Sequence, residues 1–587
     1  MSNPVDKLVG FLRELRRRNV YRVATVYVAV AFLALEAIDL LIPSTTLPPW
    51  VDEFLLAIAM LGFPIAVVVA WAVESTPDGL RLTQAVDSGN SQPQQGARSI
   101  VVPLGLVIMA AAVWWFVVDG GDNDTAETDR TIAVLPFETV GSETDDVFAD
   151  GMHLGVLTRL SNVSNLDVIS RTSVMAFRDS EKTLPQIAGA LGASWVLRAD
   201  IQESGDNVQV HARLVDARQD RQVWAQDYRR SLSAANVFEI QAELSRSIID
   251  AMHAKLTRAE GRRVDKAPTD NLEAYRMVIL GRQQINLQTE ESFRKAEEYF
   301  RMAIDEDPDY AVAWSGLGDA TWSAYAYGFD RDESRTERAE KYVLRALELD
   351  PDLAEAHAAM SGPYYLRQDG PEVIRQLNRA VELQHNYANA HSWLAYHHNI
   401  QGHPEKSLES ARRGAVLDPR SGEVISNLSL SYLTTGQYEQ ALAEALKTEE
   451  ILPSWPTASF MQGAALYHLS RYEEARAVLE GVSVDWAEDG AEANYALALV
   501  ATGDSTGARD QLAQIEKSDD LFAAGLVYAA LGEKERAIER FQQVDRWRDW
   551  PAIAIRSLYP RALGEVRADS RYEQIVRDVD RSWGITD

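Results

Sequence analysis

A short motif recurs at a fixed distance in the second half of this chain. Gly402 returns as Gly436 and Pro419 as Pro453, in both cases 34 residues later. A repeat of this length holds two antiparallel helices, and neither helix can bury its apolar face without a neighbouring repeat. Successive repeats are therefore expected to stack into a superhelix with a concave surface.

The repeating unit carries the residues that two crossing helices need. One unit has Gly436 where its helices turn, Ala441 where they cross and Pro453 where the second helix stops. This pattern resembles the tetratricopeptide repeat, and the resemblance implies an all-α superhelix that binds other proteins. We predict about six to eight such repeats across 268–580, with degenerate units at 456–520.

In that family the first helix of each pair lines the concave face, so the resemblance assigns partner contacts to residues there. These residues are acidic, polar or aromatic, namely Asp319, Trp322, Glu355, Tyr365, Asn389, Tyr396, Asn399 and Glu423. None is Lys or Arg, which clamp the terminal carboxylate of a peptide. We therefore expect a basic or apolar peptide, or a folded protein partner. For each side chain alone, a solvated helix face is the alternative.

Composition excludes several classes of function. The formal charge of −29 makes the chain a poor ligand for nucleic acid, because phosphate binding needs clustered Lys and Arg. The absence of cysteine excludes disulfides, thiolate catalysis and cysteine-ligated metals. Homo-oligomerisation is left open.

Three long apolar runs precede the rest of the chain. They cover 20–42, 54–73 and 100–118, and each is near the ~20 residues that cross a bilayer as a helix. We predict three transmembrane helices within 20–118, after a short basic tail at 1–19. The first run is too long for a signal peptide and two more follow it, so the N-terminus is expected to stay attached.

Charge predicts the direction of these spans. Arg16, Arg17 and Arg18 precede the first run, and the loop 43–53 has no Lys or Arg. The positive-inside rule then places the N-terminus in the cytoplasm. Three crossings carry the remainder, beginning with an acidic linker at 119–130, to the other side. The predicted location is a bacterial inner membrane, with the bulk of the chain in the periplasm.

Two acidic residues, Glu36 and Asp39, lie within the first apolar run, where such side chains are costly. One interpretation is a water-exposed interfacial position near the end of the span, and the other is a pairing or signalling role. The second interpretation gives an alternative function, a sensory receptor subunit that modulates a separate cytoplasmic effector through its spans.

The segment 131–260 is predicted to be a small α/β domain. It has a compact β-rich run at Thr131–Phe137 and a helical run at 184–191. Three strands are predicted next, at 195–201, 208–215 and 223–228, and an amphipathic helix follows at 238–256.

Several motifs of this segment point to a known family: IAVLPF at 132–137, FADG at 148–151 and IAGALGASWVLRADI at 187–201. They resemble the TolB amino-terminal-like (FlgO-like) domain. The segments 11–28 and 62–80 resemble the membrane region of bacterial proteins that join this domain to tetratricopeptide repeats. Some of those relatives carry a cytoplasmic adenylate cyclase or winged-helix domain, and the basic tail is too short to hold either.

Patterns for catalysis or cofactor binding are missing. GxxxxGK[ST], HExxH and GxSxG do not occur. The histidines cluster at His391, His397, His398 and His403, without a carboxylate at a tight ligand spacing, which favours packing over metal ligation. We expect no cofactor, no metal and no enzyme activity. An unrecognised site containing Asp150, His153 and Arg171 is the rival interpretation.

These features together predict three N-terminal transmembrane helices, then a small α/β domain, then a tetratricopeptide-repeat superhelix. The predicted function is a membrane-anchored, periplasm-facing scaffold that holds a protein or peptide partner in its repeat groove.

Overall fold

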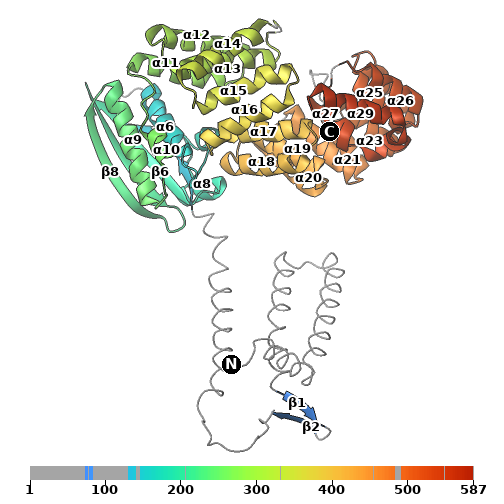
Figure 1. Cartoon of the computed structure of the whole chain (residues 1–587), viewed down its shortest axis with the longest axis horizontal. Coiled ribbons are helices and arrows are strands. Elements are labelled where there is room, and N and C mark those ends of the chain that lie inside the picture. The colour runs from blue at the N-terminus through green and yellow to red at the C-terminus, as the bar shows by residue number, and fades with distance from the viewer. Residues whose placement is uncertain are drawn as a thin grey trace, which may run out of the picture. The chain divides into compact units, whose positions relative to one another are not determined.

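The computed structural model describes residues 73–76, 79–82, 130–140, 146–204, 206–330, 332, 334–453, 455–480, 482, 491–545, 547 and 549–585. The chain forms two compact units, 1–113 and 114–587. In the first unit, the described residues form one antiparallel hairpin of β1 (Val73–Thr76) and β2 (Gly79–Leu82). All other described residues belong to the second unit, shown in colour in Figure 1.

The predicted transmembrane helices are wrong. Among the residues that the structure describes, no helix is both long and apolar enough to cross a bilayer. The longest of these helices, α9 (Ala234–Ala251), has charged residues along one side. The predicted spans 20–42 and 100–118 lie outside the described residues, as do Glu36 and Asp39. The last residue of the span 54–73 belongs to β1.

This finding also corrects the predicted inner-membrane location and the alternative of signalling through the spans. The physical reason is that hydropathy measures how apolar a run of residues is, but not what covers it.

The α/β part of the second unit is built on one mixed sheet. Its strands are β3 (Thr131–Val134), β4 (Glu138–Thr139), β5 (Asp167–Val168), β6 (Trp195–Ser204), β7 (Asn207–Asp216) and β8 (Arg221–Ser231). The order is β5-β3-β6-β7-β8, and β4 pairs with β6. The β3 strand runs parallel to β5 and β6, with Ile132 opposite Trp195, and β4 also runs parallel to β6. The pairs β6–β7 and β7–β8 are antiparallel.

Most helices of this part begin at polar caps. They are α6 (Asp146–Ser161), α7 (Arg171–Met175), α8 (Leu184–Leu191), α9 and α10 (Arg258–Asp265). Ser233 caps α9 by accepting the amide of Asn236, and Thr257 and Glu260 form a capping box at α10. Helices α6 and α9 pack on each other, and their buried residues share a core with the sheet.

Helix pairs follow in the described residues up to 543. They are α11 (Leu272–Ile285) with α12 (Glu290–Glu306), α13 (Ala311–Ala326) with α14 (Ser334–Leu349), α15 (Ala354–Leu366) with α16 (Gly370–Leu383), α17 (Ala388–Ile400) with α18 (Pro404–Leu417), α19 (Gly422–Thr434) with α20 (Tyr438–Ile451), α21 (Pro456–His468) with α22 (Tyr472–Leu479), α23 (Ala491–Ala501) with α24 (Ser505–Ile515), and α25 (Leu521–Ala530) with α26 (Lys534–Gln543). Figure 1 shows these helices stacked in sequence order.

The residues of the 34-residue motif have structural roles. Gly402 and Gly436 follow the first helix of their pairs at φ of 74° and 75°, in the left-handed region that glycine enters without steric cost. Pro419 and Pro453 each lie two residues after the second helix ends. The spacing in the sequence is therefore the spacing of the turns.

Close packing in the first two pairs depends on a glycine. A methyl group at Gly316 would lie 2.3 Å from Cε1 of Phe300, whose side chain is fully buried. We expect Gly316→Ala to lower the free energy of unfolding by about 1–3 kcal/mol, because the buried Phe300 ring must shift to make room for the methyl group. Urea unfolding measures this change.

Gly189→Ala is the matched control, because that glycine is also helical and a methyl group there would meet nothing within 4 Å. The control is expected to be neutral or to stabilise by up to about 1 kcal/mol, from helix propensity alone. Equal losses in the two variants would contradict this packing argument.

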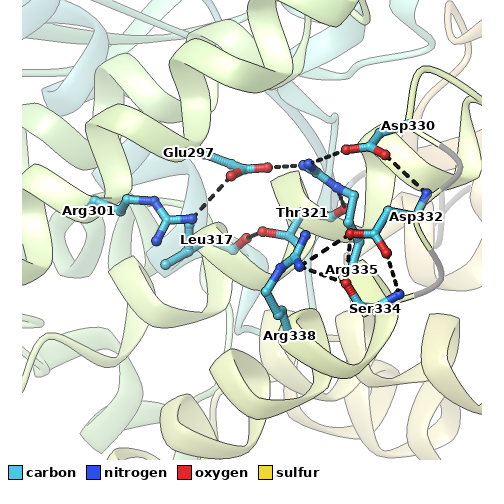
Figure 2. A network of polar contacts seen from close by, with 9 residues as sticks. All are labelled: Glu297, Arg301, Leu317, Thr321, Asp330, Asp332, Ser334, Arg335 and Arg338. Carbon is cyan, nitrogen blue, oxygen red and sulfur yellow. Dashed lines mark hydrogen bonds and ion pairs between the residues drawn. The ribbon is translucent and has the colours of Figure 1, made fainter.

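Extra residues separate α13 from α14, and an arginine holds that connection in place. Arg335 is ion-paired with Glu297 of α12 and with Asp330, at 2.8 Å, and it donates to the Thr321 carbonyl at 3.3 Å. Figure 2 shows Arg335 between these partners, with Arg338 nearer the end of the connection. The Arg335 side chain is only 14% exposed.

We expect Arg335→Met to destabilise the protein by about 1–3 kcal/mol, since it leaves the half-buried Glu297 without this partner. Arg338→Met removes a 43% exposed side chain that contacts Asp332 at 3.4 Å, and should change stability by less than about 0.5 kcal/mol. Thermal unfolding of both variants tests the difference. A larger loss in Arg338→Met would show that the connection is held elsewhere.

The α/β part is docked onto the helix pairs at two places. At the first, α6 packs against α11, where the Tyr275 hydroxyl donates to the Gly151 carbonyl at 2.5 Å. At the second, the Ser173 hydroxyl donates to Asp418 at 2.5 Å and Arg413 is ion-paired with Asp167 at 2.6 Å. The α/β part therefore spans from the first helix pair to the connection between α18 and α19.

The C-terminal segment folds back onto earlier helix pairs. It consists of α27 (Asp549–Ser557), α28 (Pro560–Leu563), the 3-10 helix η3 (Gly564–Ala568) and α29 (Ser570–Ser582), and it ends in the described residues at 585. Trp583 is 0% exposed, and its carbonyl accepts the amide of Gly370 at 3.2 Å. Arg556 of α27 donates to the carbonyl of Ile400.

Candidate binding groove

The first helices of the early pairs form one continuous inner surface. Helix α11 contacts α13, and α13 contacts α15. A cavity of about 220 Å³ opens along this surface. Its walls come from α11, α13, α15 and the start of α17, with Phe300 of α12, on one side, and from α6 and α7 of the α/β part on the other. The α/β part thus closes one side of the groove.

Three of the predicted groove residues line this cavity: Asp319, Glu355 and Asn389. Glu355 forms an ion pair with Arg282 of α11. The pKa of Asp319 is raised to about 6, mainly by burial and secondly by the negative charge of Glu355, against the lowering effect of Arg282. Among the described residues, no cation lies within ion-pair distance of Asp319. The groove therefore holds a carboxylate that lacks a positive partner.

The opposite wall carries a carboxylate that is fully engaged. Asp150 is ion-paired with Arg171 at 3.1 Å and with Arg178, and Gln283 donates to it at 2.7 Å. His153 lies one turn further along α6 with its Nε2 2.9 Å from the Val134 carbonyl. Burial lowers the pKa of His153 to about 4, so it is neutral near pH 7. The rival enzyme site therefore offers neither a free carboxylate nor an accessible imidazole.

Two further predicted residues lie beside the cavity. Glu423 is exposed and accepts a hydrogen bond from the indole of Trp393, itself a lining residue, at 3.0 Å. Trp322 is half-buried, with its ring centroid 6.5 Å from that of Tyr365. Both residues belong to the inner helices, next to the pocket rather than in it.

The remaining predicted residues, Tyr365, Tyr396 and Asn399, belong to a different environment. Tyr365 and Tyr396 pack against the core that contains the C-terminal segment, and the Tyr365 ring lies 5.8 Å from that of Trp583. Asn399 is buried and accepts a hydrogen bond from Thr434 at 2.8 Å. The structure therefore does not bring all eight predicted residues into one open surface.

Sequence reasoning missed the basic residue of the groove. Arg282 stands in the first helix of the first pair, where the unusual helix connection obscured the repeat pattern. Applying the 34-residue pattern to that helix could have found it. Asp150 and Arg171 were predicted only as members of the rival enzyme site. Their place in the wall of the groove carried no signal, because it depends on how the α/β part docks.

The four clustered histidines do not converge on one point. The Nε2 atom of His391 lies 3.0 Å from the His385 carbonyl, whereas the His397 ring packs 5.5 Å from that of Tyr365. The His398 ring lies 6.1 Å from that of His403. In the part of the chain that the structure describes, no three metal-ligating side chains are grouped as a metal site would need.

Comparison with known proteins identifies the repeats. Residues 427–483 match the family model described as "Tetratricopeptide repeat". The chain is similar to a protein of Rhizobium meliloti (strain 1021) named "Putative adenylate cyclase 3", with 30% identity over 188 residues, 32% of this chain and 32% of that protein. Tetratricopeptide repeat protein 28 of Mus musculus is 42% identical over 62 residues, 11% of this chain and 2% of that protein. The chain thus spans about a third of the first relative and a small part of the second.

Among solved structures, one titled "Functional Characterization of Pseudomonas Aeruginosa pilF" is 19% identical, with a TM-score of 0.30 over 36% of this chain and 92% of that chain. The family match covers α20, α21, α22 and the end of α19, and the pairs on either side repeat the same arrangement. The helical part of this protein is a tetratricopeptide-repeat superhelix.

Proposed function

We propose that this chain is a protein-interaction scaffold that holds a segment of a partner protein on the inner surface of its first four helix pairs. The observation that carries the proposal is the cavity on the inner helices, which includes Asp319, Glu355 and Asn389. Tetratricopeptide repeats bury their apolar faces in stacking and present the inner face for binding. This cavity gives that face space for a ligand.

The C-terminal segment supports the choice of the first four pairs. Trp583 and Arg556 contact the ends of α15 and α17, so the region around Tyr365 and Ile400 is already covered by the chain itself. A partner is therefore expected nearer the start of the repeats, beside the α/β part. The identity of 131–260 as a TolB amino-terminal-like domain stays a prediction.

The proposal includes no catalysis. The polar groups of the rival enzyme site are engaged by one another or buried, since Asp150 is held by two arginines and His153 lies in the core. A binding role requires no free general base, and the walls of the cavity come from elements that a partner would contact together.

Site-specific photocrosslinking in cells tests this proposal. A photoreactive amino acid replaces Asn389, which is exposed and lines the cavity. The matched control replaces Leu344, which is 45% exposed on α14, the second helix of its pair. We expect one reproducible protein partner to be captured at Asn389 and not at Leu344. Capture at Leu344 alone, or at neither position, would contradict the proposal.

A further inference from the structure

The carboxylates around the cavity do not all have the same number of cationic partners. The lining residues include three carboxylates, Asp150, Asp319 and Glu355, and two guanidinium groups, Arg171 and Arg282. Both guanidinium groups are already used, Arg171 by Asp150 and Arg282 by Glu355. Arg178, outside the lining, adds a second cation to Asp150. Within the described ranges, Asp319 and Glu355 together have one cationic partner, Arg282, so the unpaired negative charge lies at these two carboxylates.

This surplus charge lies where solvent is restricted. Burial is the main cause that raises the pKa of Asp319, and Glu355 on the neighbouring helix α15 is the second. A cation placed between the two carboxylates would offset both effects, because it favours the ionised form of each. An anion would disfavour the ionised form of both carboxylates. The cavity therefore selects for positive charge.

The walls also suit the apolar part of a basic side chain. Ile279 and Leu154 line the cavity, together with the rings of Tyr387 and Trp393. Aliphatic stems of lysine and arginine pack on such surfaces while the charged end is bound elsewhere, and aromatic faces attract the cation itself. A volume of about 220 Å³ holds a side chain but not a folded element. The exposed Asn389 lies at this surface and offers an amide to a peptide backbone.

We infer that the cavity binds a lysine or arginine side chain of the partner segment, with its cationic group held between Asp319 and Glu355. This inference rests on the proposed function, to which it adds the chemistry of the anchor. A free small amine shares the same cationic chemistry, so the experiment must separate the two sources.

The test measures binding of three probes to the full-length chain by isothermal titration calorimetry. The first is a tripeptide with a central arginine, blocked at both ends, and the second replaces the arginine with neutral citrulline. The third is agmatine, a free guanidinium compound. We expect saturable binding of the arginine peptide and at least tenfold weaker binding of the other two. Equal binding of the citrulline peptide would overturn the cation site, and tighter binding of agmatine would overturn the assignment to a peptide.

Variants locate the site. Asp319→Asn keeps the size of the side chain and should weaken the arginine peptide at least tenfold. Asn389→Lys introduces an ammonium group at an exposed position of the cavity wall. This group should compete with the arginine of the peptide and abolish its binding. Glu473→Gln, an exposed carboxylate on α22, is the control and should change nothing. Unchanged affinity in both Asp319→Asn and Asn389→Lys would overturn the inference.

Photocrosslinking distinguishes this inference from the proposed function. If the Asn389 probe captures the same partner with and without Asp319→Asn, the cationic anchor is wrong and the scaffold stands. If the probe captures a partner only when Asp319 is intact, both are supported. If it captures none in the unchanged chain, the proposed groove itself fails.

Discussion

Trp583→Ala is expected to lower the free energy of unfolding by about 3–5 kcal/mol, which is the usual cost of removing a fully buried tryptophan. Trp583 is 0% exposed, and its indole donates to the Trp547 carbonyl at 2.8 Å. The substitution leaves a large cavity, and the Trp547 carbonyl keeps only its hydrogen bond from Gln368, at 2.9 Å. Urea unfolding of the full-length chain measures the loss.

The same substitution should also have a local effect. The amide of Gly370 donates to the Trp583 carbonyl, so loosening the C-terminal segment should speed hydrogen exchange at the turn between α15 and α16. Arg581→Ala, which removes a 74% exposed side chain from α29, is the control and should cost less than about 0.5 kcal/mol. A loss of less than 1 kcal/mol in Trp583→Ala would show that the segment is not part of the core.

Asp418→Asn is expected to change how stability depends on pH. Asp418 is 1% exposed at the docking contact with Ser173, and burial raises its pKa from 3.8 to about 6. Between these two pH values, Asp418 therefore keeps its proton in the folded state but has released it in the unfolded state. The stabilisation is complete below about pH 4 and is lost as the pH rises through 6, by up to about 3 kcal/mol.

Asparagine cannot ionise, yet it can still accept the hydrogen bond from Ser173. The variant should therefore lose this part of the pH dependence and become the more stable form above pH 7. The measurement is the midpoint of urea unfolding from pH 4 to pH 8. Asp309→Asn, at an 84% exposed carboxylate, should keep the unchanged pH profile. An unaltered profile in Asp418→Asn would show that Asp418 is not ionised on unfolding in this window.

The sequence predicted the repeats well because their signal is local. Gly402 and Gly436 mark turns that require positive φ, and each turn concerns only neighbouring residues. The strands at 195–201 and 208–215 were also recognisable, since alternating burial along β6 and β7 follows from the pattern of apolar residues. These elements depend little on the rest of the chain.

The site was only partly predictable, because it depends on contacts between distant segments. Ser173 and Asp418 lie 245 residues apart, and Trp583 packs on Tyr365 across most of the repeats. No periodicity shows that the C-terminal segment covers part of the predicted groove. The spans predicted from hydropathy failed for a related reason, since an apolar run has the same composition whatever surrounds it.

Hydrogen exchange of the full-length chain, with and without the partner captured at Asn389, shows which helices the partner covers. We expect slower exchange on binding in the inner helices α11, α13, α15 and α17, and little change in α12, α14, α16 and α18. Protection confined to the second helices of the pairs, or to the sheet of the α/β part, would contradict this expectation.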